Sequence, residues 1–262
     1  MAPWIERMAR VGFVAKGVLY LTIGILSARS AIGAGGRTVT DTHEAMDALH
    51  GTFGRPLLAI IAFGLAGYGL WLIVSAFTDA EHKGHGAKGI AKRIGAAVRG
   101  IVHFALAGTA ASLVLWQSSG ESHDDKAQHW TARVLDTPGG IFLVWGVALA
   151  IGGYGLFQLR KAASKKLTKN LNLERLSTRT RQVVMGISRF GVAARGVVFV
   201  TIAVLFSRAA MKGDAHEAGS TSASMRELFE FGRWPFVAIA VGVAAYGIYE
   251  LVEARYRRVR AR

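Results

Sequence analysis

The sequence predicts an all-α, polytopic membrane protein whose six transmembrane helices form three parallel helical-hairpin repeats around a pseudo-threefold axis. Three observations predict this class: apolar residues in six long blocks, positive charge in every second connection, and one phrase that occurs three times. Of the 262 residues, 52% are hydrophobic and 32 are glycine. A soluble domain of this length would spread its apolar residues over short periodic segments, so long blocks indicate the membrane class.

Each apolar block is close to the roughly 20 residues that a helix needs to cross about 30 Å of hydrocarbon. The blocks lie at Val11–Ile32, Leu57–Phe77, Ile94–Trp116, Gly140–Leu159, Val183–Phe206 and Phe236–Val252. Arg7 and Arg10, followed by an apolar stretch and "SARSA", resemble a signal peptide. We expect a retained helix instead, because Lys16 interrupts the first block and its pattern returns twice later.

The net charge of +15 is distributed unevenly among the connections. Lysine and arginine fill the connections after the second and fourth blocks and the C-terminal tail, whereas acids gather in 38–55 and 117–136. This alternation follows the positive-inside rule and places both termini in the cytoplasm. Topology and attraction to anionic lipid headgroups explain the charge, so no nucleic-acid partner is needed. We expect membrane lipids as partners, and a protein partner or a homo-oligomer stays open.

The same order of features occurs three times, which divides a single membrane domain (1–262) into repeats at 1–80, 81–165 and 183–255. Each odd-numbered block opens with R-x-G-x3-[KR]-G, and these phrases start at Arg10, Arg93 and Arg189. A short helix-start signature follows in each outer connection: Asp41-x-x-Glu44, Asp125-x-x-Gln128 and Ser224-x-x-Glu227. Each even-numbered block closes on [GA]-Y-G-[LI], around Tyr68, Tyr154 and Tyr246. Because each repeat holds two spans, the repeats are parallel.

These two sets of phrases resemble the bacterial membrane family catalogued as domain of unknown function 1206, over essentially the whole chain. The resemblance implies six helices in three two-helix repeats, in a bacterial cytoplasmic (inner) membrane. It implies no activity.

Each phrase places one cation within an apolar block, at Lys16, Arg99 and Arg195. The cation lies six residues past the boundary arginine, about 9 Å along the helix axis. On the same face, at spacings of four, each helix reads small residue, cation, ring, small residue. Small residues let membrane helices approach closely. We therefore expect the glycines of the phrases to be packing positions: Gly12, Gly17, Gly95, Gly100, Gly191 and Gly196.

Two interpretations of the three cations stay open. In the first, each snorkels to lipid phosphates, and the chain is a non-enzymatic module that binds anionic lipid or a partner protein. In the second, Lys16, Arg99 and Arg195 converge on a central cytoplasmic-side site of a small anion channel or transporter. Glu250 and Gln158, four residues past their tyrosines, are the possible polar partners. We favour the first, because the outer halves of the blocks are almost purely apolar.

Other residues give weaker signals. We expect Tyr68, Tyr154 and Tyr246 to belong to an interfacial aromatic belt. His103 lies at the ring position of its helix, which favours a packed ring over a proton relay. The chain has no cysteine, no nucleophile–base pair and no cofactor fingerprint, so we expect no enzyme, no cofactor and no metal. The basic cytoplasmic connector 160–182 has leucine spacing that predicts an amphipathic helix on the inner leaflet.

Overall fold

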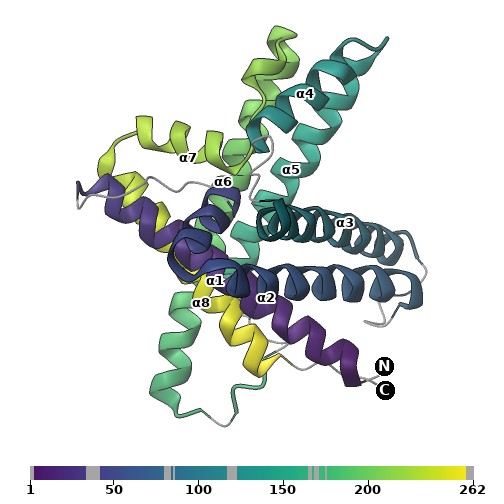
Figure 1. Ribbon diagram of the computed structural model, residues 1–262. Helices are drawn as coiled ribbons and strands as arrows, with labels where there is room; N and C mark the ends of the chain where they lie inside the picture. The colour runs from purple at the N-terminus through teal and green to yellow at the C-terminus, as the bar shows by residue number, and fades with distance from the viewer. Residues whose placement is uncertain are drawn as a thin grey trace.

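The computed structural model describes residues 3–33, 42–79, 84, 86–116, 123–164, 167, 171–174 and 176–257 (Figure 1). Its helices are α1 (Pro3–Ala31), α2 (Thr42–Thr78), α3 (Ala87–Trp116), α4 (His123–Leu135), α5 (Gly140–Ala163), α6 (Thr178–Lys212), the 3-10 helix η2 (Ala215–Glu217), α7 (Thr221–Glu230) and α8 (Arg233–Tyr256). The described residues form no strand, which confirms the all-α prediction.

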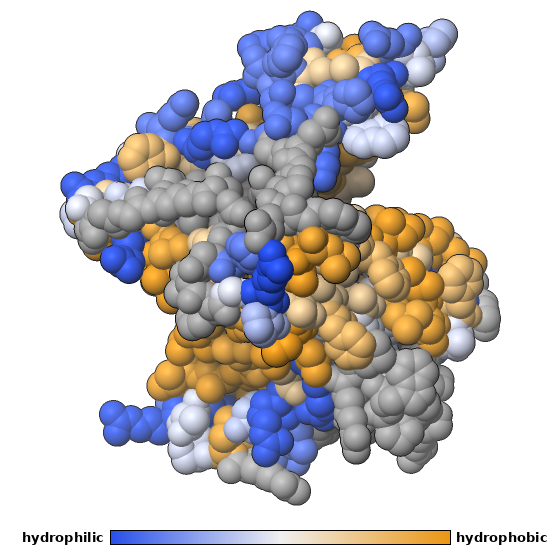
Figure 2. Space-filling model, viewed as in Figure 1, coloured by the Kyte–Doolittle hydropathy of each residue, from blue (hydrophilic) through white to orange (hydrophobic). Residues whose placement is uncertain are grey.

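Six helices are long and apolar enough to cross a membrane, as the sequence predicted. Their apolar spans are Arg10–Ala31, Gly54–Thr78, Gly89–Leu115, Gly140–Ala163, Thr178–Lys212 and Arg233–Tyr256. Figure 2 shows apolar side chains gathered in a band between two polar ends of the molecule. The two termini lie together in Figure 1, as an even number of crossings requires.

A glycine with positive φ precedes each even-numbered span. Gly54 interrupts α2 with φ 73° and separates a short outer helix from the span that begins near Pro56. Gly139 and Gly232 hold the equivalent positions before α5 and α8, with φ 78° and 123°. Because positive φ values favour glycine, these three residues fix the turn from each short helix into the membrane span that follows.

The helix-start signatures were wrong in detail. The signature Ser224-x-x-Glu227 lies inside α7, whose N-cap is Ser220. Ser224 is buried, and its hydroxyl donates to the carbonyl oxygen of Val198 at 3.1 Å. That bond joins α7 to α6, and the helix starts four residues earlier than the signature predicted. Asp125 lies in the first turn of α4, and Asp41 lies outside the described residues.

The most extensive helix contacts join neighbouring repeats. α2 packs on α3, α5 on α6 and α1 on α8 (Figure 1). Each pair combines the second span of one repeat (α2, α5 or α8) with the first span of another (α1, α3 or α6). Within repeats, α1 contacts α2 and α6 contacts α8, whereas the described parts of α3 and α5 scarcely touch. The six helices therefore form a ring that is open between α3 and α5. We call this opening the α3–α5 seam.

The core lies among α1, α2, α6, α8 and the C-terminal half of α3, and short helices close it from one side. Leu19 and Ile23 of α1 meet Leu65 of α2 there. Met46, from the short first part of α2, and Met225, from α7, are fully buried in the same cluster. The first part of α2 and α7 thus fold back into the bundle and cover its centre.

The connector between α5 and α6 does not follow the expectation of an amphipathic helix. Among its described residues, 171–174 and 176–177 are not helical. Its leucines are buried inside the protein: Leu167, Leu171 and Leu173. They pack against Tyr246 and Tyr249, and the backbone N–H of Asn172 donates to the carbonyl oxygen of Tyr256 at 2.7 Å. Because α8 offers an apolar surface within the protein, the leucines bury there instead of in lipid.

Candidate anion-binding site

Glycine pairs bring the repeats together in the same way at three interfaces. A Cβ on one glycine would lie within 3.1 Å of the carbonyl oxygen of its partner at Gly17–Gly247, Gly100–Gly69 and Gly196–Gly155. Any side chain at these points would push the helices apart. The second glycine of each phrase therefore sets the crossing of the first span of one repeat with the second span of a neighbouring repeat.

The first glycine of the phrase packs within its own repeat in only two cases. A Cβ on Gly12 would lie 2.3 Å from the Cβ of Tyr68, and one on Gly191 would lie 2.3 Å from the backbone nitrogen of Tyr246. The packing expected of Gly95 is not found, because a Cβ there would meet nothing within 4 Å. The reason is the open seam, which leaves α3 without α5 as a neighbour.

A ring pair accompanies each glycine crossing. Tyr20 packs on Tyr246, His103 on Tyr68 and Phe199 on Tyr154, with ring centroids 4.8, 4.8 and 5.0 Å apart. The three tyrosines therefore face protein, and the expectation of an interfacial aromatic belt was wrong for them. The glycine crossings bring the helices close enough to turn these rings inward. The ring of His103 is also fixed by a contact of Nδ1 with the carbonyl oxygen of Arg99 at 2.6 Å.

Lys16 is paired inside the bundle. Its Nζ lies 2.9 Å from Oε1 of Glu250, and the two side chains are only 9% and 1% exposed. The ammonium group also lies over the rings of Phe13 and Tyr68, 5.5 and 4.6 Å from their centroids. Lys16 therefore does not snorkel to a membrane surface.

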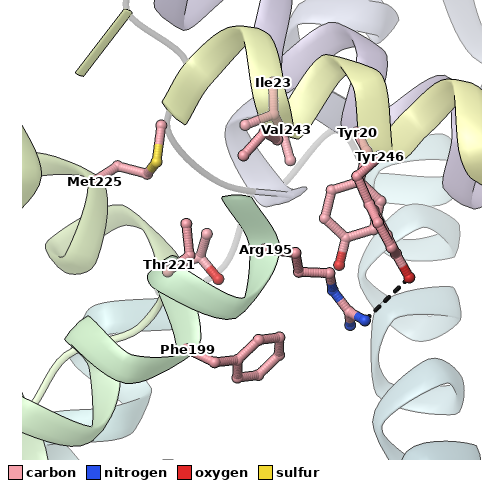
Figure 3. Close-up of a pocket in the computed structure, with 9 residues that line it drawn as sticks. Tyr20, Ile23, Arg195, Phe199, Thr221, Met225, Val243 and Tyr246 are labelled. Atoms are coloured by element: carbon pink, nitrogen blue, oxygen red, sulfur yellow. Dashed lines mark hydrogen bonds between the residues drawn. The ribbon is translucent and has the colours of Figure 1, made fainter. Parts of the chain in front are cut away.

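Arg195 is held by hydroxyl groups and aromatic rings. Its Nη1 donates to the hydroxyls of Tyr154 and Tyr246, at 3.3 and 3.0 Å. Figure 3 shows the guanidinium extending between Phe199 on one side and Tyr20 and Tyr246 on the other. The ring centroids of these residues lie 4.7–5.6 Å from its central carbon, distances typical of cation–π contacts.

Glu250 joins the two cations into one network. Its Oε1 accepts hydrogen bonds from both Lys16 and the hydroxyl of Tyr246, which in turn accepts from Arg195. Gln158 and Leu72, at the equivalent positions of the other repeats, are also buried, so all three share the register that the sequence predicted. Among the described residues, however, Gln158 makes no hydrogen bond to a repeated cation.

The cations outnumber the acids around this network. Lys16 and Arg195 share one acid, Glu250, through the hydroxyl of Tyr246. Arg99 is exposed, and its Nε donates to the carbonyl oxygen of Gly95 on its own helix at 3.1 Å. Glu250 can balance only one of the three cations. Within the part of the chain that the structure describes, Nε of Arg195 has no hydrogen-bond partner.

A small cavity lies beside Arg195. Its volume is about 30 Å³, which is room for about two water molecules. The polar lining residues are Tyr20, Arg195, Thr221 and Tyr246 (Figure 3). The other lining residues are apolar: Ile23, Val198, Phe199, Met225 and Val243. The cavity is thus a small, mostly apolar space with a guanidinium in its wall, a setting suited to a small anion.

The sequence analysis missed the role of the first arginine of the phrase. Nη1 of Arg10 donates to the carbonyl oxygen of Ala254 at 2.8 Å, at the end of α8. Nε of Arg93 donates in the same way to Ala76 at the end of α2, at 2.6 Å. These bonds satisfy free carbonyl groups at the C-terminal ends of α8 and α2. The position of Arg10 and Arg93, at the start of the repeated phrase, was the available signal.

A second polar cluster lies near the C-terminal end of α8. Oε1 of Glu253 accepts hydrogen bonds from the hydroxyl of Tyr249 at 2.9 Å and from Nη1 of Arg257 at 3.2 Å. Nζ of Lys161 lies 3.5 Å from the same tyrosine hydroxyl. No three potential metal ligands of the His, Asp or Glu type gather among the described residues.

The repeats defined by these crossings coincide with a known family. Its profile matches residues 11–79, 94–165 and 190–257, one segment for each repeat. The chain belongs to the family described as Domain of Unknown Function (DUF1206). It is 27% identical over 260 residues to the uncharacterized protein YxxB of Bacillus subtilis (strain 168), covering 98% of this chain and 93% of that protein. No solved structure matches the chain.

Proposed function

We propose that this membrane protein is a non-enzymatic module of the bacterial inner membrane that binds a small anion beside Arg195. The observation that carries the proposal is the bonding of the guanidinium, whose hydrogen-bond acceptors among the described residues are two tyrosine hydroxyls and no carboxylate. The nearby acid, Glu250, carries a single negative charge, and its Oε1 already accepts from Lys16 and Tyr246. Its Oε2 has no hydrogen-bond partner among the described residues. One positive charge of this pair of cations is therefore left without an anion.

The energetics favour a bound counter-ion. Moving a charged group from water into a protein interior costs several kcal/mol, even after relaxation. Tyrosine hydroxyls and ring faces recover part of this cost for Arg195, and a charge-assisted hydrogen bond to an anion recovers more. A cavity of about 30 Å³ has the size of about two waters, which suits a halide such as chloride and excludes a phosphate headgroup.

The same cavity supports binding over conduction. Beyond Arg195 its walls are apolar, formed by residues such as Ile23, Val198 and Val243. On another side α7 covers it through Met225, and the bond from Ser224 to Val198 holds that helix in place. The alternative, an anion channel or transporter with Lys16, Arg99 and Arg195 lining one site, would need a polar path through these walls.

Chloride-dependent stability tests the proposal. The purified protein in nanodiscs is unfolded by heat in sodium chloride and in sodium gluconate of the same ionic strength. At a chloride concentration ten times the Kd, binding adds about 1.4 kcal/mol of stability. Arg195→Gln should abolish the difference between the two salts. Arg208→Gln is the matched control, because Arg208 lies on the same helix in a half-exposed pair with Glu227.

The conservative variant Arg195→Lys keeps the experiment decisive if Arg195→Gln does not fold. A lysine retains the charge and loses the guanidinium geometry, so we expect chloride to stabilise this variant at a higher concentration. An equal response to chloride in the wild type and in the Arg195 variants would overturn the proposal. If radioactive chloride enters proteoliposomes and this uptake depends on Arg195, the function is transport instead of binding alone.

A further inference from the structure

The second repeat exposes a helix face that the other two repeats bury. Only 22% of the span is buried in each of α3 and α5, against 44–50% in the other four spans. On α1 and α6, Ala15 and Ala194 are each 3% exposed, whereas the equivalent Val98 of α3 is 54% exposed. One turn further, the repeated positions Leu19, Val198 and Val102 are 2%, 4% and 50% exposed.

The facing wall of the seam shows the same difference. Ile61 of α2 is buried, and the equivalent Val147 of α5 is 44% exposed. Gly64 and Gly242 are buried against the odd helices of their repeats, whereas Ala150 at this position is exposed. Both walls of the α3–α5 seam therefore present apolar side chains where the other repeats have a helix–helix interface.

The charge of the seam is entirely positive. Neither α3 nor α5 contains an aspartate or a glutamate. Arg99 is exposed on α3, and its side chain runs back along the helix to the carbonyl oxygen of Gly95. Leu72 stands where an acid equivalent to Glu250 would meet Arg99. Lys92, in the first part of α3, and Arg160, in the last turn of α5, are also exposed.

We propose that the α3–α5 seam is a binding site for one anionic phospholipid. Arg99 binds the headgroup phosphate, and the acyl chains lie over Val98, Val102 and Val147. Apolar walls fit acyl chains, and a guanidinium that has no acid beside it among the described residues fits a phosphate. This site is separate from the Arg195 cavity, which is too small for a headgroup. The second repeat thus uses its cation for lipid, whereas the first and third use theirs inside the bundle.

Native mass spectrometry of the protein released from nanodiscs tests the site. In discs of phosphatidylglycerol and phosphatidylcholine, we expect one phosphatidylglycerol to stay bound to the wild type. Arg99→Gln should weaken its retention about fivefold, the effect of one arginine on an anionic lipid. Arg29→Gln, which removes an exposed cation at the opposite end of α1, is the control. Replacing chloride with gluconate should leave lipid retention unchanged, which separates this proposal from the chloride site.

Two further arms identify the occupant. Inorganic phosphate added to discs of pure phosphatidylcholine should not stabilise the protein, and stabilisation that depends on Arg99 would point to a free anion instead. The chain lacks cysteine, so Val102→Cys and Val147→Cys can be combined and cross-linked with a short bifunctional maleimide. Phosphatidylglycerol should reduce the cross-linking yield by keeping the helices apart. Efficient cross-linking in phosphatidylglycerol, or retention unchanged by Arg99→Gln, would overturn the proposal.

Discussion

Removing Lys16 while keeping Glu250 should be one of the most destabilising single substitutions in this chain. The two charged atoms lie 2.9 Å apart, and both side chains are almost fully buried. At about 4 Å and an effective dielectric constant of 20, such a pair is attracted by about 4 kcal/mol. Loss of one partner from a buried pair costs about 3–5 kcal/mol when the other charge is left uncompensated. Because Glu250 stays linked to Arg195 through the hydroxyl of Tyr246, we expect Lys16→Met to lower the free energy of unfolding by the lower end of this range, about 3 kcal/mol.

The double variant Lys16→Met with Glu250→Met separates the pair from general packing. Because it removes both charges, its stability should return to within about 1–2 kcal/mol of the wild type. Unfolding in mixed micelles of rising dodecyl sulfate content measures all four members of the cycle. Lys212→Gln is the control, since its ion pair with Glu217 is exposed and worth about 0–1 kcal/mol. A loss below 1 kcal/mol in Lys16→Met, or no recovery in the double variant, would refute the reasoning.

Three other predictions follow from the geometry. Gly12→Ala should lower the free energy of unfolding by about 1–3 kcal/mol, because the new methyl group overpacks against Tyr68. Gly95→Ala, whose methyl group would meet no neighbouring atom, should stabilise the helix by up to about 1 kcal/mol, and the same unfolding assay compares the two variants. Burial raises the pKa of Asp124, but hydrogen bonds from Ser220, Arg226 and Ser222 outweigh it and lower the pKa to about 2. The contribution of Asp124 to stability is thus complete above its unfolded-state pKa of about 4 and is lost as pH falls through about 2. Hydrogen exchange of α7 should rise over that pH window, and Asp124→Asn should remove the pH dependence. A fluorescent protein fused to the C-terminus should fluoresce and an alkaline phosphatase fused there should be inactive, since the positive-inside rule places this end in the cytoplasm; the reverse pattern would overturn the orientation.

Local residue patterns were enough to predict the spans, the repeats and the burial of several key side chains. The apolar blocks and the threefold phrase predicted six membrane helices, because helix formation in lipid depends on the length and polarity of each segment alone. The spacing from each tyrosine predicted that Leu72, Gln158 and Glu250 share one level, and all three are buried. Helical periodicity is a property of the segment itself, so it can be counted along the chain.

The tertiary structure decided the partner of each cation. Lys16 is paired because Glu250 faces it, whereas Arg195 lies among tyrosines. Arg99 is exposed because α5 does not cover α3. Lys16 and Glu250 lie 234 residues apart in the chain, so no local pattern links them. Which faces interlock depends on the fit of all six helices together, and that fit turned the tyrosines inward and left the second repeat open.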